Sequence, residues 1–256
     1  MKRKNLAFIC IVAVLAVAAA GIFGCARGSK STIAIDAEHF PDANFRAYIA
    51  DLYDRNDDGM LDKNEIRSAK NCAPKNLAIR SLEGIEWLTE LERLNCTGNE
   101  LEHLDVSKNT KLVFLDVSLN PMAEIDLSTN PALTGFVSYS TPLKSLDVKS
   151  NTNLKTLYCS GYEFTELDIS GHASLVEVQC SSGLLTNLIA HDCPALKNLR
   201  CEENALTSLD LHGCSALRSI IYYQNPITIL NLTGCDHMQD YQPDQISWEE
   251  EITVLR

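Results

Sequence analysis

The sequence predicts an α/β repeat solenoid with a parallel β-sheet on its concave face, preceded by a small helical cap. The main observation is that apolar residues return at 21-residue intervals from Leu91 onward. A second observation is the acidic segment DRNDDGMLDKNE at residues 54–65, which stands before the repeats. One repeat cannot bury its own apolar side, so neighbouring repeats must stack and share a continuous core.

The repeats follow one another seven times without an insertion or deletion, beginning with LERLNCTGNELEHLDVSKNTK. Their most regular apolar column contains Leu94, Leu115, Phe136, Leu157, Val178, Leu199 and Ile220. The period and the L-x-x-L-x-L-x-x-N/C-x-L core resemble leucine-rich repeats. We expect the solenoid to cover residues 77–238. A C-terminal cap at 239–256 is expected to follow, because Ile252 and Val254 alternate as in a short strand.

A polar column follows the apolar one and begins and ends with asparagine. Its members are Asn99, Asn120, Thr141, Tyr162, Gly183, Asn204 and Asn225. We expect the asparagines to turn inward and to bond backbone groups of adjacent turns, because buried backbone groups need partners. The column is interrupted at three central repeats.

Ten cysteines occur in the chain, and most of them follow the repeat. Four occupy an inward position of the strand, namely Cys96, Cys159, Cys180 and Cys201. Three more continue a second polar column that begins with asparagine, and these are Cys193, Cys214 and Cys235. This regular placement favours buried thiols that pack as small apolar groups over a disulfide framework. Cys72 lies outside the repeats, and its state stays open.

The first residues have the layout of a secretory signal. Three basic residues at positions 2–4 precede an apolar run over residues 5–23, which ends in IFGC at Cys25. This ending resembles the lipobox of bacterial lipoproteins. It implies a signal peptide at 1–24, a lipid on Cys25, a short tether at 25–35 and a place in the bacterial cell envelope. A retained membrane anchor and simple secretion are the alternatives.

The charge of the mature chain excludes some partners. Removal of residues 1–24 leaves 19 Lys and Arg against 34 Asp and Glu. So acidic a chain is not expected to bind nucleic acid or to be drawn electrostatically to anionic membranes. We expect contact with the membrane only through the N-terminal lipid.

The acidic segment fits the pattern D-x-[DN]-x-[DN]-G-x5-E at every position. Helical spacing of apolar residues before it and KNEIRSAK after it complete the likeness to an EF-hand, and we assign residues 36–76 to a single EF-hand and N-terminal cap. Hard oxygen ligands at this spacing suit Ca²⁺. The expected ligands are Asp54, Asn56, Asp58, the Met60 carbonyl, Asp62 and Glu65. The alternative is an acidic surface turn without a metal.

The sequence contains a single such loop, although EF-hands usually pair. Three interpretations follow: the hand caps the first repeat, docks a partner, or pairs between two molecules. The cap needs the fewest assumptions, because the end of a solenoid requires a cover. Taken together, the lipobox, the single hand and the repeats resemble bacterial surface leucine-rich repeat proteins of internalin-like architecture. That resemblance implies binding to a protein or a glycan and no catalysis.

Outward-facing positions of the predicted sheet carry aromatic and apolar side chains on neighbouring repeats. We expect a ligand-binding patch formed by Phe114, Val137, Tyr139 and Tyr158. The alternative is that these side chains only pack on one another.

Two other groups point more weakly to cations. An aspartate column on the second half of the repeat is expected to cap solvent-exposed turns. His191 and Cys193 recur one repeat later as His212 and Cys214. This pairing would suit zinc, but the cysteines are expected to face inward and the histidines outward. No nucleophile elbow, phosphate loop or HExxH segment occurs, so we expect no enzyme.

Overall fold

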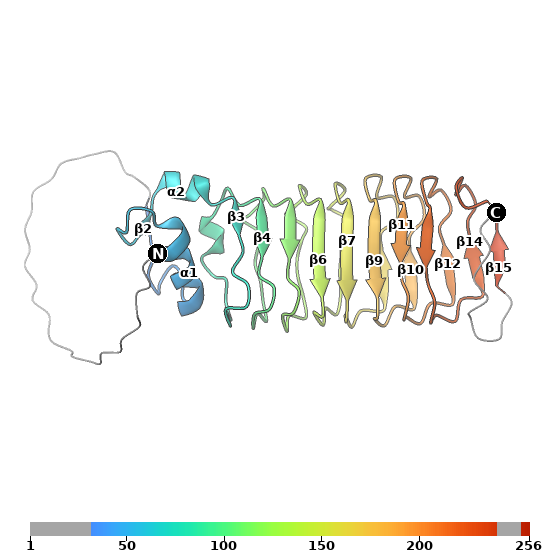
Figure 1. Cartoon of the computed structure of the whole chain (residues 1–256), viewed down its shortest axis with the longest axis horizontal. Coiled ribbons are helices and arrows are strands. Elements are labelled where there is room, and N and C mark those ends of the chain that lie inside the picture. The colour runs from blue at the N-terminus through green and yellow to red at the C-terminus, as the bar shows by residue number, and fades with distance from the viewer. Residues whose placement is uncertain (1–31, 240–251) are drawn as a thin grey trace, which may run out of the picture. The chain divides into compact units, whose positions relative to one another are not determined.

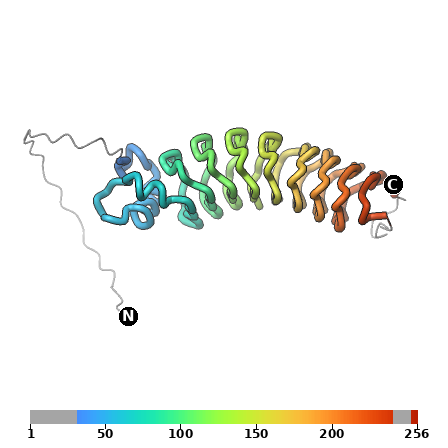
Figure 2. The backbone as a smooth tube through the Cα atoms, turned by 90° about the horizontal axis from the view of Figure 1, so that it is seen from above, coloured from blue at the N-terminus to red at the C-terminus, as the bar shows by residue number. Residues whose placement is uncertain are grey.

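The computed structural model describes residues 32–239 and 252–256 of the chain. Two parallel sheets form two walls of a stack of coils, and Figure 2 shows each repeat as one flattened coil. The larger wall, here called the long sheet, has the strand order β13-β11-β9-β7-β6-β5-β4-β3 (Figure 1). The smaller wall, the short sheet, has the order β15-β14-β12-β10-β8.

The bounds of the strands follow the repeat. The long sheet contains β3 (Asn71–Cys72), β4 (Arg93–Asn95), β5 (Phe114–Asp116), β6 (Gly135–Tyr139), β7 (Thr156–Ser160), β9 (Glu177–Ser181), β11 (Asn198–Arg200) and β13 (Ser219–Ile221). The short sheet contains β8 (Glu166–Asp168), β10 (Asn187–Ile189), β12 (Ser208–Asp210), β14 (Ile229–Asn231) and β15 (Thr253–Leu255). The N-terminal elements are β1 (Ile33–Ala34), α1 (Ala43–Tyr53), β2 (Met60–Leu61), α2 (Lys63–Ser68) and the 3₁₀ helix η1 (Ile85–Trp87).

The register of the long sheet explains the 21-residue period. Leu94 pairs with Leu115, and Leu115 pairs with Phe136, so each strand lies beside the equivalent strand of the next repeat. These three side chains are fully buried. The predicted apolar column is therefore a physical stack, and each repeat, called a rung from here on, covers the core of its neighbour.

The expected α/β class is wrong for the repeats. Within residues 93–239 the structure contains strands and turns but no α-helix, and the two α-helices both precede the first rung. A rung of this length returns through short extended segments, several of which pair as the short sheet. The fold is a parallel-sheet β-solenoid of stacked coils. The segment at 240–251 lies outside the described residues, and β15 closes the short sheet beside β14.

The asparagine column forms hydrogen bonds between rungs as expected. Asn120 donates through Nδ2 to the Cys96 carbonyl of the preceding rung and to the Val117 carbonyl of its own rung. Its Oδ1 accepts from the Leu101 amide at 3.1 Å. Asn225 makes the equivalent set one repeat after Asn204. These amides satisfy backbone groups in the interior where water has no access.

At the interruption of the column, a tyrosine hydroxyl makes one of the bonds that the missing amides would make. Tyr162 is buried, and its hydroxyl donates to the Cys180 carbonyl at 2.6 Å and lies 3.0 Å from Asn204 Oδ1. A Cβ atom on Gly183 would lie 2.1 Å from the Tyr162 ring, so the glycine makes room for it. Thr141 bonds the Val117 carbonyl through its hydroxyl. The interruption is therefore a different solution to the same hydrogen-bonding requirement.

The second polar column changes from amides to thiols along the stack. Asn130 and Asn151 donate to carbonyls of the preceding rung, and Cys193 and Cys214 donate through Sγ to the carbonyls of Ile169 and Ala190. All eight cysteines of the described residues are buried and free, Cys72 among them. Burial raises the pKa of Cys72 and of Cys159 to about 12, because an apolar interior disfavours the thiolate. The expected buried thiols are confirmed for these residues.

The expected signal peptide and the lipid-bearing Cys25 lie outside the described residues. Within the part that is described, no helix has the length and apolar character needed to cross a membrane.

Replacement of Tyr162 by phenylalanine tests the account of the interrupted column. The change removes one of two donors to the Cys180 carbonyl, which keeps its bond from Asn204, and we expect a loss of about 0.5–1.5 kcal/mol in the free energy of unfolding. Urea denaturation measures the loss. The control is Tyr223→Phe, because Tyr223 is 49% exposed, and its effect should stay within about 0.5 kcal/mol. Equal effects of the two changes would contradict the account.

Candidate functional site

The N-terminal candidate site is a helix–loop–helix whose two helices are capped by aspartates. Helix α1 begins after Asp42, whose side chain accepts from the amides of Asn44 and Phe45. Helix α2 begins after Asp62, which forms a capping box with Glu65: each side chain accepts from the backbone of the other. The 12-residue segment that resembles a calcium loop runs from the end of α1 to the first turn of α2.

Hydrogen bonds inside the loop hold its polar side chains against its own backbone. Asp54 accepts from the amides of Asp58 and Gly59, at 3.2 and 2.9 Å. Asn56 also accepts from the Asp58 amide, and Asp58 accepts from the Met60 amide. Gly59 has φ +73°, the left-handed conformation that the sharp turn of this loop requires.

The loop offers oxygen donors of the kind that Ca²⁺ prefers, since carboxylates, an amide and the Met60 carbonyl stand at the expected spacing. Glu65 is buried, and its two oxygens accept from the amides of Arg55 and Asp62, both at 2.8 Å. In this described loop no three acidic side chains bring their oxygens within 4.8 Å of one another. The donor set fits Ca²⁺, and binding would draw these oxygens closer together.

The edge of the loop is covered by the residues just before the hand. Strand β1 pairs antiparallel with β2, so that Ile33 lies opposite Leu61, and the Ile35 amide donates to the Gly59 carbonyl. The last residues of the expected tether thus belong to the fold. In a paired EF-hand this edge would be available to a second loop, whereas here the chain itself covers it. This arrangement disfavours pairing between two molecules.

The N-terminal segment with its two helices packs onto the first turn of the solenoid through its apolar face. Phe40, Phe45 and Ile49 are fully buried and belong to the same hydrophobic cluster as the rungs. Gly84 has φ +102°, and a Cβ atom there would lie 2.3 Å from the Phe40 ring. The backbone at Gly84 therefore allows Phe40 to approach closely.

Polar contacts join the same two parts. Asp42 caps α1 through one carboxylate oxygen, and its other oxygen accepts from the Arg80 amide at 2.8 Å. The Asn44 side chain donates to the Leu77 carbonyl, and the Tyr53 hydroxyl donates to the Asn71 carbonyl at 2.6 Å. Burial disfavours the Asp42 carboxylate, but bonds from four amides outweigh this effect and hold its pKa below the ordinary value.

The second candidate site is the outer face of the long sheet, the sheet that we expected on the concave side. Three adjacent strands, β5, β6 and β7, bring together all four predicted ligand-binding residues. Phe114 lies across from Gly135, and the Arg93 guanidinium stands 4.3 Å from the centre of its ring. Val137 is only 8% exposed, so it supports the patch and offers little surface of its own.

The two tyrosines form a stacked pair within this patch. Tyr139 and Tyr158 are half-buried and stack with ring centres 6.2 Å apart and planes at 11°. The Tyr139 hydroxyl donates to Gln179 at 3.2 Å. Burial, and then the hydrogen bond with Glu177, raise the pKa of Tyr158 to about 12, so the hydroxyl stays neutral. An amphipathic stack of this kind can contact an apolar or a sugar surface.

One acidic residue of this face was not predicted from the sequence. Glu202 on the same face is 4% exposed, and its Oε1 accepts from Arg200 at 2.8 Å. Its Oε2 is buried and has no hydrogen-bond partner. A buried carboxyl oxygen without a partner is unusual, which adds Arg200 and Glu202 to the candidate surface. The signal in the sequence was the single acidic residue in a column of Thr, Ser and Tyr.

The aspartate column behaves as turn caps. Asp105, Asp126 and Asp147 each accept from the amide two residues later, at 2.8–2.9 Å. The bonds from the amide and the side chain of Ser107 lower the pKa of Asp105. The cysteines beside the two histidines point into the core, as expected, which removes them from any zinc site at the surface.

Comparison with known proteins supports the repeat architecture. No protein-family model matches the chain. Internalin J of Listeria monocytogenes is 32% identical over 71 residues, which is 28% of this chain and only 8% of internalin J. The similarity therefore covers a small part of that protein.

Solved structures resemble the chain over a greater length. An internalin of Listeria monocytogenes has a TM-score of 0.66 at 18% sequence identity, over 77% of this chain and 64% of the other. Internalin C2 of the same organism has a TM-score of 0.65 at 16% identity, over 90% of this chain and 100% of the other. At these identities the likeness shows the fold alone: an internalin-like leucine-rich repeat solenoid.

Removal of the Asp42 carboxylate tests the junction between the hand and the solenoid. Asp42→Ala should lower the free energy of unfolding at about pH 7 by about 1 kcal/mol or more, since it removes a helix cap. Folding lowers the pKa of Asp42 below 3.8, so its stabilisation is complete above the ordinary carboxyl range and is lost as pH falls through the folded value. Urea unfolding of the unaltered protein and of Asp42→Ala should show a smaller difference in the free energy of unfolding at about pH 2.5 than at about pH 7. A difference that widens in acid would reject this role.

Proposed function

We propose that this chain is a lipid-anchored bacterial envelope protein that binds a protein or a glycan through the outer face of its long sheet. The observation that carries the proposal is the stacked Tyr139–Tyr158 pair, with Glu202 buried on the same face. Parallel strands hold these side chains at fixed spacing, so little conformational entropy is lost when a ligand binds. Tyrosine offers a large amphipathic surface with few rotatable bonds.

The placement in the envelope rests on the sequence. The apolar run that ends at Cys25 supports export and lipid attachment, and the high proportion of acidic residues argues against nucleic acid as a partner. Likeness to internalins in fold supports a role in recognition. We infer no catalytic activity.

The proposal also assigns Ca²⁺ to the hand, where it stabilises the cap. The ligands would be Asp54, Asn56, Asp58, the Met60 carbonyl, Asp62 and Glu65. Bound calcium supplies charge that holds these oxygens together. The packing of Phe40, Phe45 and Ile49 in the solenoid core supports a stabilising cap over a free docking module.

Alanine replacement of both tyrosines tests the binding face. Tyr139→Ala with Tyr158→Ala should abolish capture of ligands from bacterial envelope extracts and from an array of surface glycans, while the fold is retained. The matched control is Ile229→Ala, which removes a side chain that is 46% exposed on the short sheet and should leave capture unchanged. Unchanged capture by the double tyrosine variant would reject the binding face.

Calcium addition tests the role of the hand. Saturating Ca²⁺ should raise the unfolding temperature, since a ligand at 100 times its Kd adds about 2.7 kcal/mol to the free energy of unfolding. Asp54→Ala with Glu65→Ala should abolish the increase without loss of ligand capture. Loss of capture by this variant, combined with a thermal stability that calcium does not change in the unaltered protein, would favour the alternative that the hand is the docking surface.

A further inference from the structure

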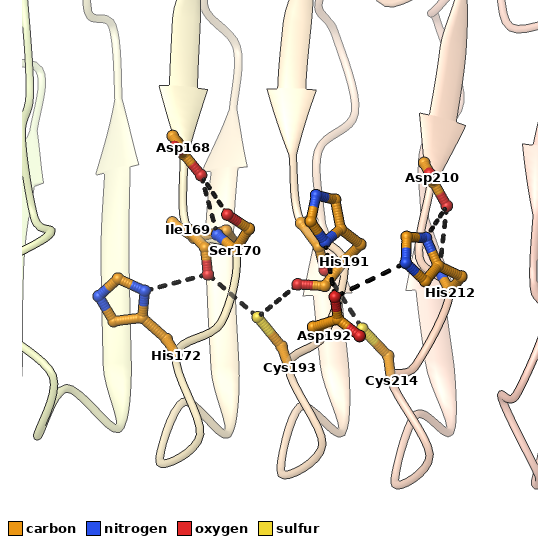
Figure 3. A network of polar contacts seen from close by, with 11 residues as sticks. Asp168, Ile169, Ser170, His172, His191, Asp192, Cys193, Asp210, His212 and Cys214 are labelled. Carbon is orange, nitrogen blue, oxygen red and sulfur yellow. Dashed lines mark hydrogen bonds and ion pairs between the residues drawn. The ribbon is translucent and has the colours of Figure 1, made fainter.

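Three polar side chains from two adjacent rungs converge after strands β10 and β12, away from the hand (Figure 3). Asp192 Oδ2 lies 3.0 Å from His191 Nδ1 and 3.6 Å from His212 Nε2. All three donor atoms lie within 4.8 Å of one another. In the described ranges, no other group of three His, Cys, Asp or Glu residues meets this condition.

The backbone places the Asp192 carboxylate in a turn where the neighbouring rungs have glycine. Gly171, Gly213 and Gly234 occupy the equivalent position with φ of 71°, 75° and 75°. Asp192 adopts the same left-handed conformation with φ 55°, which is less favourable for a residue with a side chain. A Cβ atom on Gly213 would lie 2.5 Å from Asp192 Oδ1. The glycine of the next rung thus leaves the space that this carboxylate occupies.

The turns do not require histidine at these two positions, because smaller side chains make the same local hydrogen bond in neighbouring rungs. In the rungs before and after them, a hydroxyl makes the local bond: Ser170 donates to Asp168, and Thr233 donates to Asn231, both at 2.7 Å. At His212 the imidazole Nδ1 makes the equivalent contact, 2.9 Å from Asp210 Oδ1. A carboxylate on one ring nitrogen orients the ring and leaves the other nitrogen for a metal.

His191 has no carboxylate of this kind, because the residue two positions earlier is Ile189. Its Nδ1 is directed to Asp192, and its ring stacks on His212 with centres 4.7 Å apart and planes at 12° (Figure 3). A local capping role therefore accounts for neither the imidazole of His191 nor the carboxylate of Asp192.

The donor set selects a class of cation. Two imidazoles and one carboxylate suit first-row transition metals such as Zn²⁺, whereas Ca²⁺ and Mg²⁺ prefer oxygen alone. With metal–ligand distances of about 2.0–2.2 Å, two ligands of a tetrahedral site lie roughly 3.4 Å apart. The present separations of 3.0 and 3.6 Å bracket that value. The stacked rings would have to tilt toward the ion, and side-chain exposures of 34% and 41% leave them free to turn.

We propose that His191, Asp192 and His212 bind a divalent transition-metal cation that joins two neighbouring rungs, with Asp210 as a positioning residue for the His212 ring. The proposal does not depend on the calcium loop or on the ligand-binding face.

Zinc titration of the full chain in the presence of excess Ca²⁺ tests the site, with the metal measured by calorimetry. We expect one Zn²⁺ per chain. Asp192→Gly and His212→Thr, which copy neighbouring rungs, should each lower the affinity for Zn²⁺ at least about 10-fold. Neither change should lower the unfolding temperature of the metal-free protein, since the new residues are those that the same turn already carries elsewhere.

The matched control is His237→Thr, which removes a histidine from outside the cluster and should bind Zn²⁺ as the unaltered protein does. Asp210→Ala should lower the affinity about 10- to 100-fold and change the ¹⁵N shifts that report the His212 tautomer, with rescue by Asp210→Asn. No zinc binding by the unaltered chain would overturn the proposal. So would undiminished binding by Asp192→Gly and His212→Thr, because that result would assign the metal to the buried thiols or to the hand.

Discussion

Every coil of this protein depends on its neighbours for its backbone hydrogen bonds. The strands of both sheets pair only with the equivalent strands of adjacent rungs. In the interior, side chains at fixed positions of the rung bond backbone groups that the strand pairing leaves without partners. Asn120 bonds two rungs at once, Tyr162 spans the interrupted stretch, and Cys193 donates its thiol to the rung before it. Loss of one such group removes a hydrogen bond from a buried backbone carbonyl.

This dependence makes the ends of the stack the weak points. The first rung has no earlier rung beside it, and Phe40 and Phe45 of the N-terminal segment belong to the same hydrophobic cluster as the rungs. Asp42 serves the helix and the solenoid at once, because its two oxygens accept from α1 and from Arg80. At the other end, β15 pairs with β14. The acidic loop lies between the two helices of this N-terminal segment.

The repeat period predicted the stacking, the register and the inward direction of the cysteines, because each follows from which side chains must be buried. The return half of the rung was mispredicted as part of an α/β repeat, since the same Leu spacing suits several backbone conformations. Tyr162 and Gly183 looked like an interruption, and only the packed structure shows that one fills the space of the other. The unpartnered oxygen of Glu202 and the Asp192 cluster arise from turns and rung contacts that periodicity does not encode.

The patch on the long sheet and the cluster of histidines show two consequences of the same regular backbone. Equivalent positions on adjacent rungs lie side by side, so a substitution in two neighbouring repeats creates a paired surface feature. Tyr139 with Tyr158 arises in this way on the sheet, and His191 with His212 arises in this way at the turns. The scaffold can therefore acquire new sites without a change in its core.

The central claim is that the helix–loop–helix and the first rungs form one cooperative unit. Native-state hydrogen exchange with increasing urea measures this most directly. The account predicts that the amides of α1, of Arg80 and of Leu101 exchange with the same opening free energy, because the junction must break before any of them is exposed. Exchange of the α1 amides at low urea, while the Leu101 amide stays protected, would contradict it.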